Sequence, residues 1–401
     1  MKGLSRRLAV VAVAAVSAAA IAVGCGSDDE ADKASAGGGG ASGGGSIPIG
    51  LVTDVSGPFV TVGKDVEAAV KLAVEEINAD GGVNGAQLDL TMIDTGGEPP
   101  QAVTGYRSLV DNGAVAALGP MTSGEAKVLF KQAAGQKLPL ITGTANEEGL
   151  TDLGENWAFR NTATNGELYD VALPAWQKAY DVTSAVLVYD EEQPTSAAAA
   201  AAVPGAAEKA GVEIVNADAP ITFRTGETDF SSIVQRIKKT EADGLIILTA
   251  PTEGGLLARE IARQSETRPV LGNPPQAGAS FFEGGGDRID NWVLPSIFDP
   301  ENDNPKTASY VKEMGERDKE PPTIPEAANY YDAVYLIAEA MKSAGVTPDT
   351  DPAEAREKVR DALLNLSIQG AAGDISFKGD PSAEKTIFVK VVRNGKTETL
   401  D

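Results

Sequence analysis

A short polar stretch after an apolar run is the first place in this sequence where chemistry is expected. Residues 117–127 read ALGPMTSGEAK, so Thr122, Ser123 and Gly124 separate a small apolar segment from residues that favour helix. Hydroxyl groups beside the free N–H groups of a helix start can bind an anion. They can equally cap the helix, because serine and threonine are preferred N-cap residues. The stretch alone leaves both interpretations open.

Similar polar stretches follow other apolar runs of the chain. With Pro120–Gly124 they are Thr53–Pro58, Thr142–Asn146, Tyr189–Thr195, Thr249–Glu253 and Gly272–Gln276. In an α/β fold, ligands bind beyond the carboxyl ends of parallel strands, so these stretches are expected to line a ligand site. None of them carries the G-x-G-x-x-G or G-x-x-x-x-G-K-[ST] pattern of nucleotide sites, and no cofactor is predicted.

The composition excludes several classes of function. The 401 residues include no histidine and one cysteine, Cys25, and the formal net charge is -24. The first two facts remove histidine-based catalysis, Ser-His-Asp and Cys-His pairs and the usual zinc sites, and no metal site is predicted. The negative charge disfavours nucleic acid and anionic lipid as partners. A carboxylate-only active site stays open, as does an oxygen-ligand Ca²⁺ site, although no D-x-[DN]-x-[DN]-G loop supports the latter.

The first 46 residues are expected to address and tether the protein. Residues 1–24 have a basic start and an apolar run, which is typical of a secretory signal peptide. Its end, AVGC, resembles a bacterial lipobox, which implies that Cys25 is lipid-modified; a plain signal with a chance cysteine is the alternative. Residues 25–46 are rich in glycine, serine and alanine and predict a flexible tether. The folded part is therefore expected at the outer face of the cytoplasmic membrane, held by the lipid alone.

From Ile47 onward, short apolar segments alternate with helical periodicity. Strands are expected at 47–53, 86–94, 114–119 and 138–142, and a second series at 184–190, 212–217, 244–250 and 269–272. Long helices are expected at 306–317, 325–344 and 352–365, before two last strands at 373–377 and 386–392. This alternation predicts an α/β protein in which parallel sheets are flanked by helices.

The order of six segments resembles a known family. They read GLVTDVSGPFVTVG, AVEEINADGGVNG, ALGPMTSGEAK, LPLITGTANEEGLT, FRTGETDFSSIVQRIKKTEADGLIIL and ANYYDAVYLIAEAM. In this order they are similar to type I substrate-binding proteins of ABC transporters, in the leucine/isoleucine/valine-binding branch. The resemblance covers Ile47 to about Asn394 and implies two Rossmann-like lobes joined by three crossing strands.

The resemblance also implies where the lobes begin and end. Lobe one would comprise 47–163 and 298–378, and lobe two 164–297 and 379–401. The crossings would fall near Thr162–Asn165, Leu294–Ile297 and Gly379. The lobes of such proteins close over a small ligand, and the closed form docks on a permease.

In lobe one, the resemblance assigns ligand contacts to two of the polar stretches. Ser123 matches a serine that holds the ligand carboxylate by its side chain and backbone N–H. Thr144 and Asn146 lie where the family contacts the ligand ammonium and carboxylate, with asparagine in place of threonine. The family's tyrosine in the first loop is Val62 here. The candidate residues of lobe one are Ser56, Thr122, Ser123, Thr144, Ala145, Asn146 and Tyr330.

Lobe two departs further from the family pattern. An expected tyrosine falls at Pro194, and the acidic residue that pairs with the ligand ammonium falls at Pro274. An ammonium group without a carboxylate partner is costly to bury, so either Glu253 or another acid takes that role or the ligand is not an α-amino acid. The candidate residues here are Gln193, Thr195, Thr249 and Gln276, and the expected ligand is an amino acid, an amide or a small carboxylate.

These observations predict a monomeric, lipid-anchored solute-binding protein, not an enzyme, that delivers a small ligand to an ABC permease. A ligand-sensing domain for a partner receptor has the same fold and is one alternative. An extracytoplasmic, carboxylate-dependent hydrolase is the other.

Overall fold

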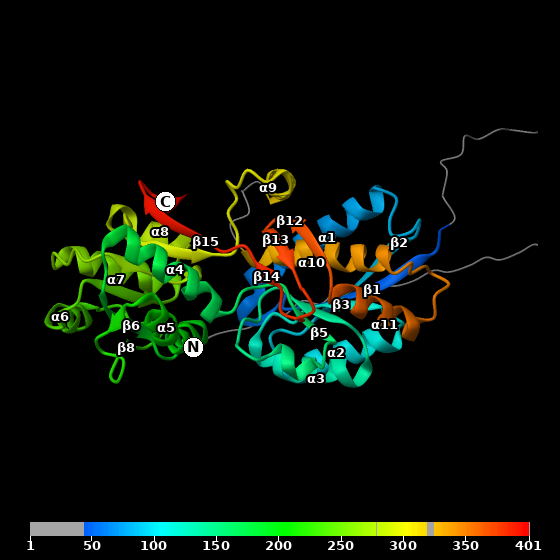
Figure 1. The fold of residues 1–401 in the computed structure, drawn as a ribbon, viewed down its shortest axis with the longest axis horizontal. Coiled ribbons are helices and arrows are strands. Elements are labelled where there is room, and N and C mark those ends of the chain that lie inside the picture. Colours follow the sequence, from blue (N-terminus) through cyan, green and yellow to red (C-terminus); the bar gives the residue numbers. More distant parts are fainter. Residues whose placement is uncertain (1–43, 278, 319–324, 401) are drawn as a thin grey trace, which may run out of the picture. The chain divides into compact units, whose positions relative to one another are not determined.

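The computed structural model describes residues 44–277, 279–318 and 325–400. The predicted signal peptide (1–24), the predicted lipidation site Cys25 and nearly all of the predicted tether (25–46) lie outside the described residues. Contacts group residues 44–401 into one unit, whose two large sheets appear in Figure 1. Among the described helices, none combines the length and the apolar character that crossing a membrane requires.

The first sheet has five parallel strands in the order β2-β1-β3-β4-β5. The strands are β1 (Ser46–Thr53), β2 (Gln87–Asp94), β3 (Ala116–Leu118), β4 (Leu140–Thr142) and β5 (Ala158–Arg160). The helices of this part are α1 (Val60–Ala79), α2 (Pro99–Asp111), α3 (Ser123–Gln136), α9 (Pro305–Asp318), α10 (Pro325–Ser343) and α11 (Pro352–Leu363).

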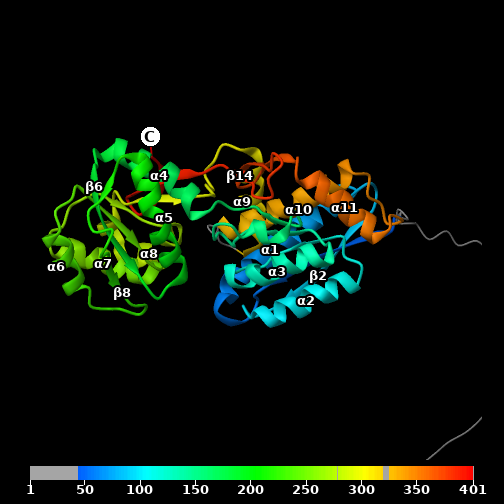
Figure 2. The same cartoon turned by 60° about the horizontal axis from the view of Figure 1, so that its bottom comes forward.

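The side chains of β1 alternate between two buried clusters, which explains why helices cover both faces of this sheet. Ile49 and Leu51 are buried in a cluster with α1 and α10, whereas Val52 is buried in a second cluster with α2 and α3. Successive side chains of a strand point to opposite faces, so an almost continuous apolar strand needs cover on both sides. Figure 2 shows α2 and α3 side by side in this half of the molecule.

The second sheet has eight strands, in the order β16-β15-β11-β10-β9-β6-β7 with β8 also paired to β6. The strands are β6 (Ser184–Asp190), β7 (Glu213–Ile214), β8 (Ile221–Phe223), β9 (Gly244–Leu248), β10 (Val270–Leu271), β11 (Val293–Ser296), β15 (Phe388–Arg393) and β16 (Lys396–Thr399). Pairing is parallel except for β11 with β15 and β15 with β16.

Helices cover both faces of the second sheet as well. They are α4 (Asn165–Tyr180), α5 (Pro194–Ala210), α6 (Ser231–Lys239), α7 (Pro251–Arg263) and α8 (Ala279–Gly285). Leu187 and Ile246 are buried with α4 and α5, and their neighbours Val186 and Leu245 are buried with α6 and α7. The predicted fold class, parallel sheets flanked by helices, is therefore confirmed.

A small antiparallel sheet completes the chain path. It consists of β12 (Ser367–Gly370), β13 (Gly373–Ser376) and β14 (Glu384–Lys385). The chain leaves the first sheet after β5, leaves the second after β11, and enters the second again between β14 and β15. The predicted lobe boundaries remain predictions. Because β14 pairs with β13, we propose that the last boundary lies between residues 385 and 388 rather than at 378/379.

Candidate functional site

The start of α3 separates the roles of its two hydroxyl residues. Thr122 is the N-cap: its Oγ1 accepts the N–H of Glu125 at 3.2 Å, and Glu125 Oε2 accepts the N–H of Thr122 at 3.2 Å. This reciprocal pair is a capping box. Ser123 is the first helical residue, half-buried, and its hydroxyl has no hydrogen-bond partner among the described residues. Thr122 therefore caps the helix and leaves the Ser123 hydroxyl available.

The loops after β3 and β4 are tied together by one carbonyl group. Pro120 O accepts hydrogen bonds from the hydroxyls of Tyr330 at 2.7 Å, Thr142 at 2.8 Å and Thr144 at 3.3 Å. Thr142 Oγ1 in turn accepts the N–H groups of Thr144 and Ala145 at 3.2 and 3.0 Å. Burial raises the pKa of Tyr330 to about 12, so its hydroxyl keeps its proton and donates. These contacts hold the two candidate loops in a fixed register.

Two other candidate residues lie in the loops at the carboxyl ends of the first sheet's strands and form fewer hydrogen bonds. Asn146 is half-buried, and its side-chain amide has no hydrogen-bond partner in the described part of the chain. Ser56 is exposed in the loop after β1, where its N–H donates to Asp94 Oδ1 at 3.3 Å. Ser123 and Asn146 thus present unpaired polar side chains, while the ligand role of Ser56 remains a prediction.

A buried pair of acidic residues lies at the start of α3, and the sequence analysis did not predict it. Thr95 Oγ1 lies 2.5 Å from Asp54 Oδ1 and 2.7 Å from Glu125 Oε1. Both carboxyl groups belong to fully buried residues, and burial raises the pKa of each. Asp54 directly follows β1, so the pair links the first loop to the capping box of α3.

In the second sheet, the predicted candidates form hydrogen bonds in two pairs, Gln193 with Thr195 and Gln276 with Thr249, and with the backbone around them. Gln193 is the N-cap of α5, where its Oε1 accepts the N–H of Ser196 and its Nε2 donates to Thr195 Oγ1, both at 2.6 Å. Gln276 is fully buried, and its Nε2 donates to Ile247 O at 3.1 Å and to Thr249 Oγ1 at 3.2 Å. These bonds brace the strand ends, and a ligand role for the four residues remains a prediction.

Two polar atoms at this edge were missed by the sequence reasoning. Ser196 Oγ and Asn273 Nδ2 are buried and have no hydrogen-bond partner among the described residues. Asn273 Oδ1 accepts the N–H of Thr249 at 3.2 Å, which leaves the amide N–H₂ of Asn273 as the unpaired group. Asn273 lies inside the stretch Gly272–Gln276 that the sequence analysis singled out, whereas Ser196 lies one residue beyond the stretch Tyr189–Thr195.

A chain of polar contacts connects the end of β14 and the residue after β5 to the loop after β4. Lys385 Nζ donates to Asn161 Oδ1 at 3.1 Å, Asn161 Nδ2 donates to Asn329 O at 2.7 Å, and Asn329 Nδ2 donates to Gly143 O at 2.9 Å. Gly143 belongs to the loop after β4, whereas Lys385 ends β14. Burial lowers the pKa of Lys385 to about 8, although nearby Asp332 opposes this shift.

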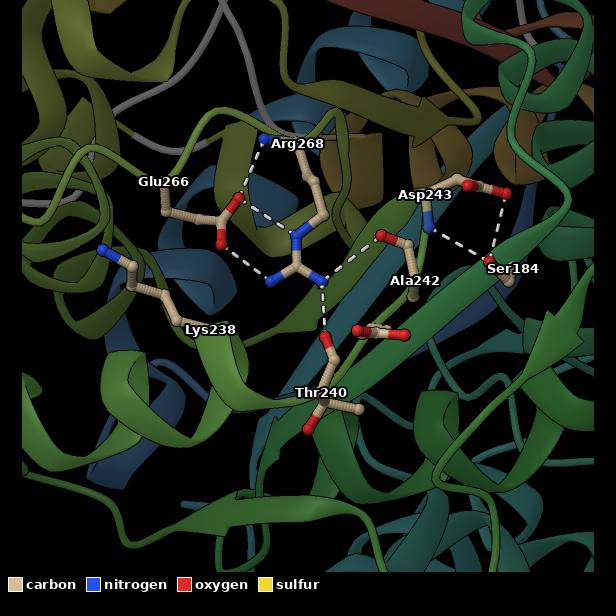
Figure 3. Close-up of a pocket in the computed structure, with 8 residues that line it drawn as sticks. Ser184, Lys238, Thr240, Ala242, Asp243, Glu266 and Arg268 are labelled. Atoms are coloured by element: carbon tan, nitrogen blue, oxygen red, sulfur yellow. Dashed lines mark hydrogen bonds and ion pairs between the residues drawn. The ribbon is translucent and has the colours of Figure 1, made fainter.

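A hollow at the amino ends of the strands of the second sheet is lined mainly by charged and polar side chains. Figure 3 shows its charged side chains bonded within the protein: Arg268 to Glu266 at 2.7 Å and to Thr240 O at 2.9 Å. The N–H of Asp243 donates to Ser184 Oγ at 3.0 Å. Ser184 begins β6, so this hollow lies at the amino ends of the strands and not at the ligand edge. The described residues include no group of three acidic or cysteine side chains placed to hold a metal ion.

Comparison with known proteins gives concordant results. Residues 46–396 match the family model described as "Periplasmic binding protein". The chain is 26% identical over 304 residues to the Leu/Ile/Val-binding protein homolog 3 of Brucella melitensis, covering 76% of this chain and 81% of that protein. It is 25% identical over 339 residues to the leucine-, isoleucine-, valine-, threonine- and alanine-binding protein of Pseudomonas aeruginosa, covering 84% and 87%.

The fold is also similar to that of solved substrate-binding proteins. The branched-chain amino acid transporter substrate-binding protein LivJ of Streptococcus pneumoniae, solved in complex with isoleucine, superposes with a TM-score of 0.74 at 25% identity. The superposition covers 88% of this chain and 98% of LivJ.

Proposed function

We propose a transport function for this chain, which belongs to the periplasmic binding protein family through residues 46–396. It captures a small polar ligand between two closing lobes outside the cytoplasmic membrane and delivers it to an ABC importer without chemical turnover. Cys25 carries the lipid anchor, and the tether of residues 25–46 gives the lobes freedom to reach the permease.

The start of α3 is the observation that carries this proposal. The Ser123 hydroxyl is unpaired within the described residues, whereas Thr122 already caps the helix. Free N–H groups and the helix dipole favour an anion at such a helix start, and a serine hydroxyl adds a donor. Asn146, on the neighbouring loop, contributes a second unpaired side chain. We assign the binding of the ligand's carboxylate group to Ser123 and Asn146.

The other half of the ligand meets a different environment. Pro274 stands where the family places an acid, and Glu253 Oε1 already accepts the N–H of Gly226 at 3.1 Å. The unpaired groups of this edge are the amide N–H₂ of Asn273, which only donates, and the hydroxyl of Ser196, which can donate or accept. Donors favour an oxygen acceptor on the ligand over an ammonium group. The names of the relatives support an aliphatic amino acid, and the donors extend the class to small carboxylates without an ammonium group.

A thermal-shift comparison of matched compounds tests the proposal on residues 44–401. Leucine, leucinamide and 4-methylpentanoate share one side chain and differ only in the carboxylate and the ammonium group. A ligand that binds the folded state raises the unfolding temperature by mass action. We expect 4-methylpentanoate or leucine to raise it and leucinamide to have no effect, because leucinamide lacks the carboxylate.

The pattern of shifts separates the possible outcomes. A shift with leucine alone would show that another acid binds the ammonium group and would contradict the argument from Pro274. A shift with leucinamide alone would contradict the assignment of the carboxylate to Ser123. Turnover of any compound, followed by mass spectrometry, would contradict the binding function itself.

A further inference from the structure

We propose that Asp54 carries a proton at neutral pH and, as a neutral carboxyl group, positions Glu125 at the start of α3. This inference goes beyond the proposed function, and it concerns two residues that are not among the candidate ligand residues.

The first step is a count of hydrogens. The Thr95 hydroxyl lies within hydrogen-bond distance of one oxygen of Asp54, at 2.5 Å, and one oxygen of Glu125, at 2.7 Å. A hydroxyl group has a single hydrogen, so it can donate to only one of the two. Were both carboxyl groups ionised, the other contact would place two oxygens together with no hydrogen between them. One carboxyl group must therefore supply a second hydrogen.

The second step decides which group holds it. Glu125 Oε2 accepts the N–H of Thr122 at 3.2 Å and the hydroxyl of Thr122 at 2.9 Å, so both oxygens of Glu125 are satisfied as acceptors. Its position in the first turn of α3 also favours a negative charge. Asp54 Oδ1, the oxygen that faces Thr95, also accepts the N–H of Gly97 at 2.8 Å, and Asp54 Oδ2 is buried without a partner among the described residues. An unpaired oxygen is less costly on a neutral group, so the proton belongs to Asp54.

The surrounding charges act in the same direction. Asp94, at the end of β2, and Glu125, on α3, are the acids that face Asp54, and Tyr330 of α10 is the further titratable group that acts on Glu125. No lysine or arginine of the described chain forms an ion pair with Asp54 or Glu125. Burial, and then the neighbouring acid, raise the pKa of Asp54 against its bonds from Thr95 and Gly97. A second negative charge beside Glu125 would therefore have no paired cation among the described residues.

The hydrogen bonds then run in one direction: Asp54 donates to the Thr95 hydroxyl, and the Thr95 hydroxyl donates to Glu125. It leaves one negative charge beneath the start of α3 instead of two. If the proposed function holds, the single charge also limits repulsion of a ligand carboxylate at Ser123. The test below uses no ligand, so it can fail independently of the transport proposal.

The pH dependence of unfolding in the variant Asp54→Asn is the first test. The folded chain binds a proton at Asp54 that the unfolded chain releases above about pH 4, so in the wild type this group lowers stability as the pH rises from about 4 through neutrality. Asparagine reproduces the neutral charge but not every bond, because Asp54 Oδ1 contacts both Thr95 and the N–H of Gly97, and an amide N–H₂ in that place would lose the bond from Gly97. That loss does not depend on pH, so we expect the unfolding temperature of D54N to rise relative to that of the wild type as the pH increases from about 5 to about 8.

The matched control is Glu125→Gln, which changes the other carboxyl group in the same way. It removes the charge that accepts both groups of Thr122, so we expect a lower unfolding temperature at about pH 7. If the unfolding temperature of E125Q rises relative to the wild type with increasing pH and that of D54N does not, the proton is on Glu125 and the proposal is wrong. The same pH dependence in the two variants would contradict it as well.

A spectroscopic measurement on the full chain keeps the test independent of how well the variants fold. With ¹³C in the aspartate carboxyl groups, a protonated Asp54 contributes a carbonyl band in the infrared spectrum at about pH 7 that shifts on labelling. We expect this band in the wild type and its loss in D54N. A wild-type protein whose ¹³C NMR signal for Asp54 is that of a carboxylate at about pH 6 would overturn the proposal.

Discussion

At the scale of single residues, Thr122 and Ser123 are sequence neighbours whose hydroxyl groups have different hydrogen-bond partners. Thr122 closes a capping box with Glu125, and Ser123 keeps an unpaired hydroxyl within the described residues. Removing each hydroxyl should therefore change a different quantity.

We expect Ser123→Ala to weaken ligand binding without lowering stability. A hydrogen bond to a charged group contributes about 1.5–3 kcal/mol, so Kd should rise about tenfold or more. Thr122→Ala is the matched control and should cost about 1 kcal/mol of stability through the lost cap. Calorimetric titration and denaturant unfolding of both variants measure the two effects. Unchanged affinity in S123A would reduce Ser123 to a spacer next to the cap.

Lys385 gives a second prediction at this scale. Burial lowers the pKa of Lys385 to about 8, whereas an exposed lysine has a pKa of about 10.4. Between these pH values the unfolded chain binds a proton that the folded chain does not, so the free energy of unfolding should rise with pH. Lys385→Met should remove this rise, as urea unfolding at about pH 8 and about pH 10 would show. Parallel pH profiles for the two proteins would contradict the assignment.

How far these residues could be predicted depends on the separation of their partners. The capping box spans three residues, so Thr122 and Glu125 could be paired by the T-x-x-E spacing. Asp54 and Thr95 are 41 residues apart, and Thr95 and Glu125 are 30 apart. No local pattern joins them, because β1, β2 and α3 meet only through the order of strands in the sheet.

At the scale of elements, apolar periodicity was a sound guide where an element is long or fully buried. The expected strand at 47–53 is β1, and the expected helix at 325–344 is α10. The expectation of two last strands was wrong, because β12, β14 and β16 accompany β13 and β15. One signal was present: Asn394 and Gly395 have φ values of 51° and 75° in the turn between β15 and β16. An Asn-Gly pair between strand segments is typical of such a hairpin.

The contact between the loop after β4 and helix α10 gives a prediction at this scale. A Cβ atom on Gly143 would lie 2.9 Å from Tyr330 Cδ2 and 3.1 Å from Asn329 Cβ. We therefore expect Gly143→Ala to lower stability by about 1–3 kcal/mol through overpacking and to weaken ligand binding by moving the loop.

The control for this prediction is Gly135→Ala, within helix α3. A Cβ atom there meets nothing within 4 Å, and alanine favours helix over glycine by up to about 1 kcal/mol. G135A should thus be as stable as the wild type or more so in urea unfolding, with unchanged ligand affinity. Equal stability losses in the two variants would show that the loop is not packed tightly on α10.

At the scale of the whole molecule, the motif order predicted more than any single motif. It predicted two α/β parts in series, and the structure has two such sheets with helices on both faces. The place of the last crossing could not be read in this way. It depends on the pairing of β14, a strand of two residues, Glu384 and Lys385, with no pattern of its own.

Closure of the lobes gives the prediction at this scale. A ligand that contacts both lobes favours the closed state by its difference in affinity for the two states. We expect saturation with a ligand found in the thermal-shift comparison to lower the radius of gyration in small-angle scattering. At the same ligand concentration S123A should show a smaller change, because less of it is bound. A radius that stays constant at saturation would contradict a closing mechanism.

The pairing of β11 with β15 has a consequence for how this protein is made. All five strands of the first sheet have left the ribosome once residue 160 has emerged, but Val293 must wait for Val391 to complete the second sheet. Until then β11 presents an open edge, the kind of edge that recruits strands from other chains. A nascent chain of this protein should thus depend on chaperones that cover this edge until its last strands emerge. A stop codon shortly before Phe388 should yield aggregates even though most of each lobe is intact.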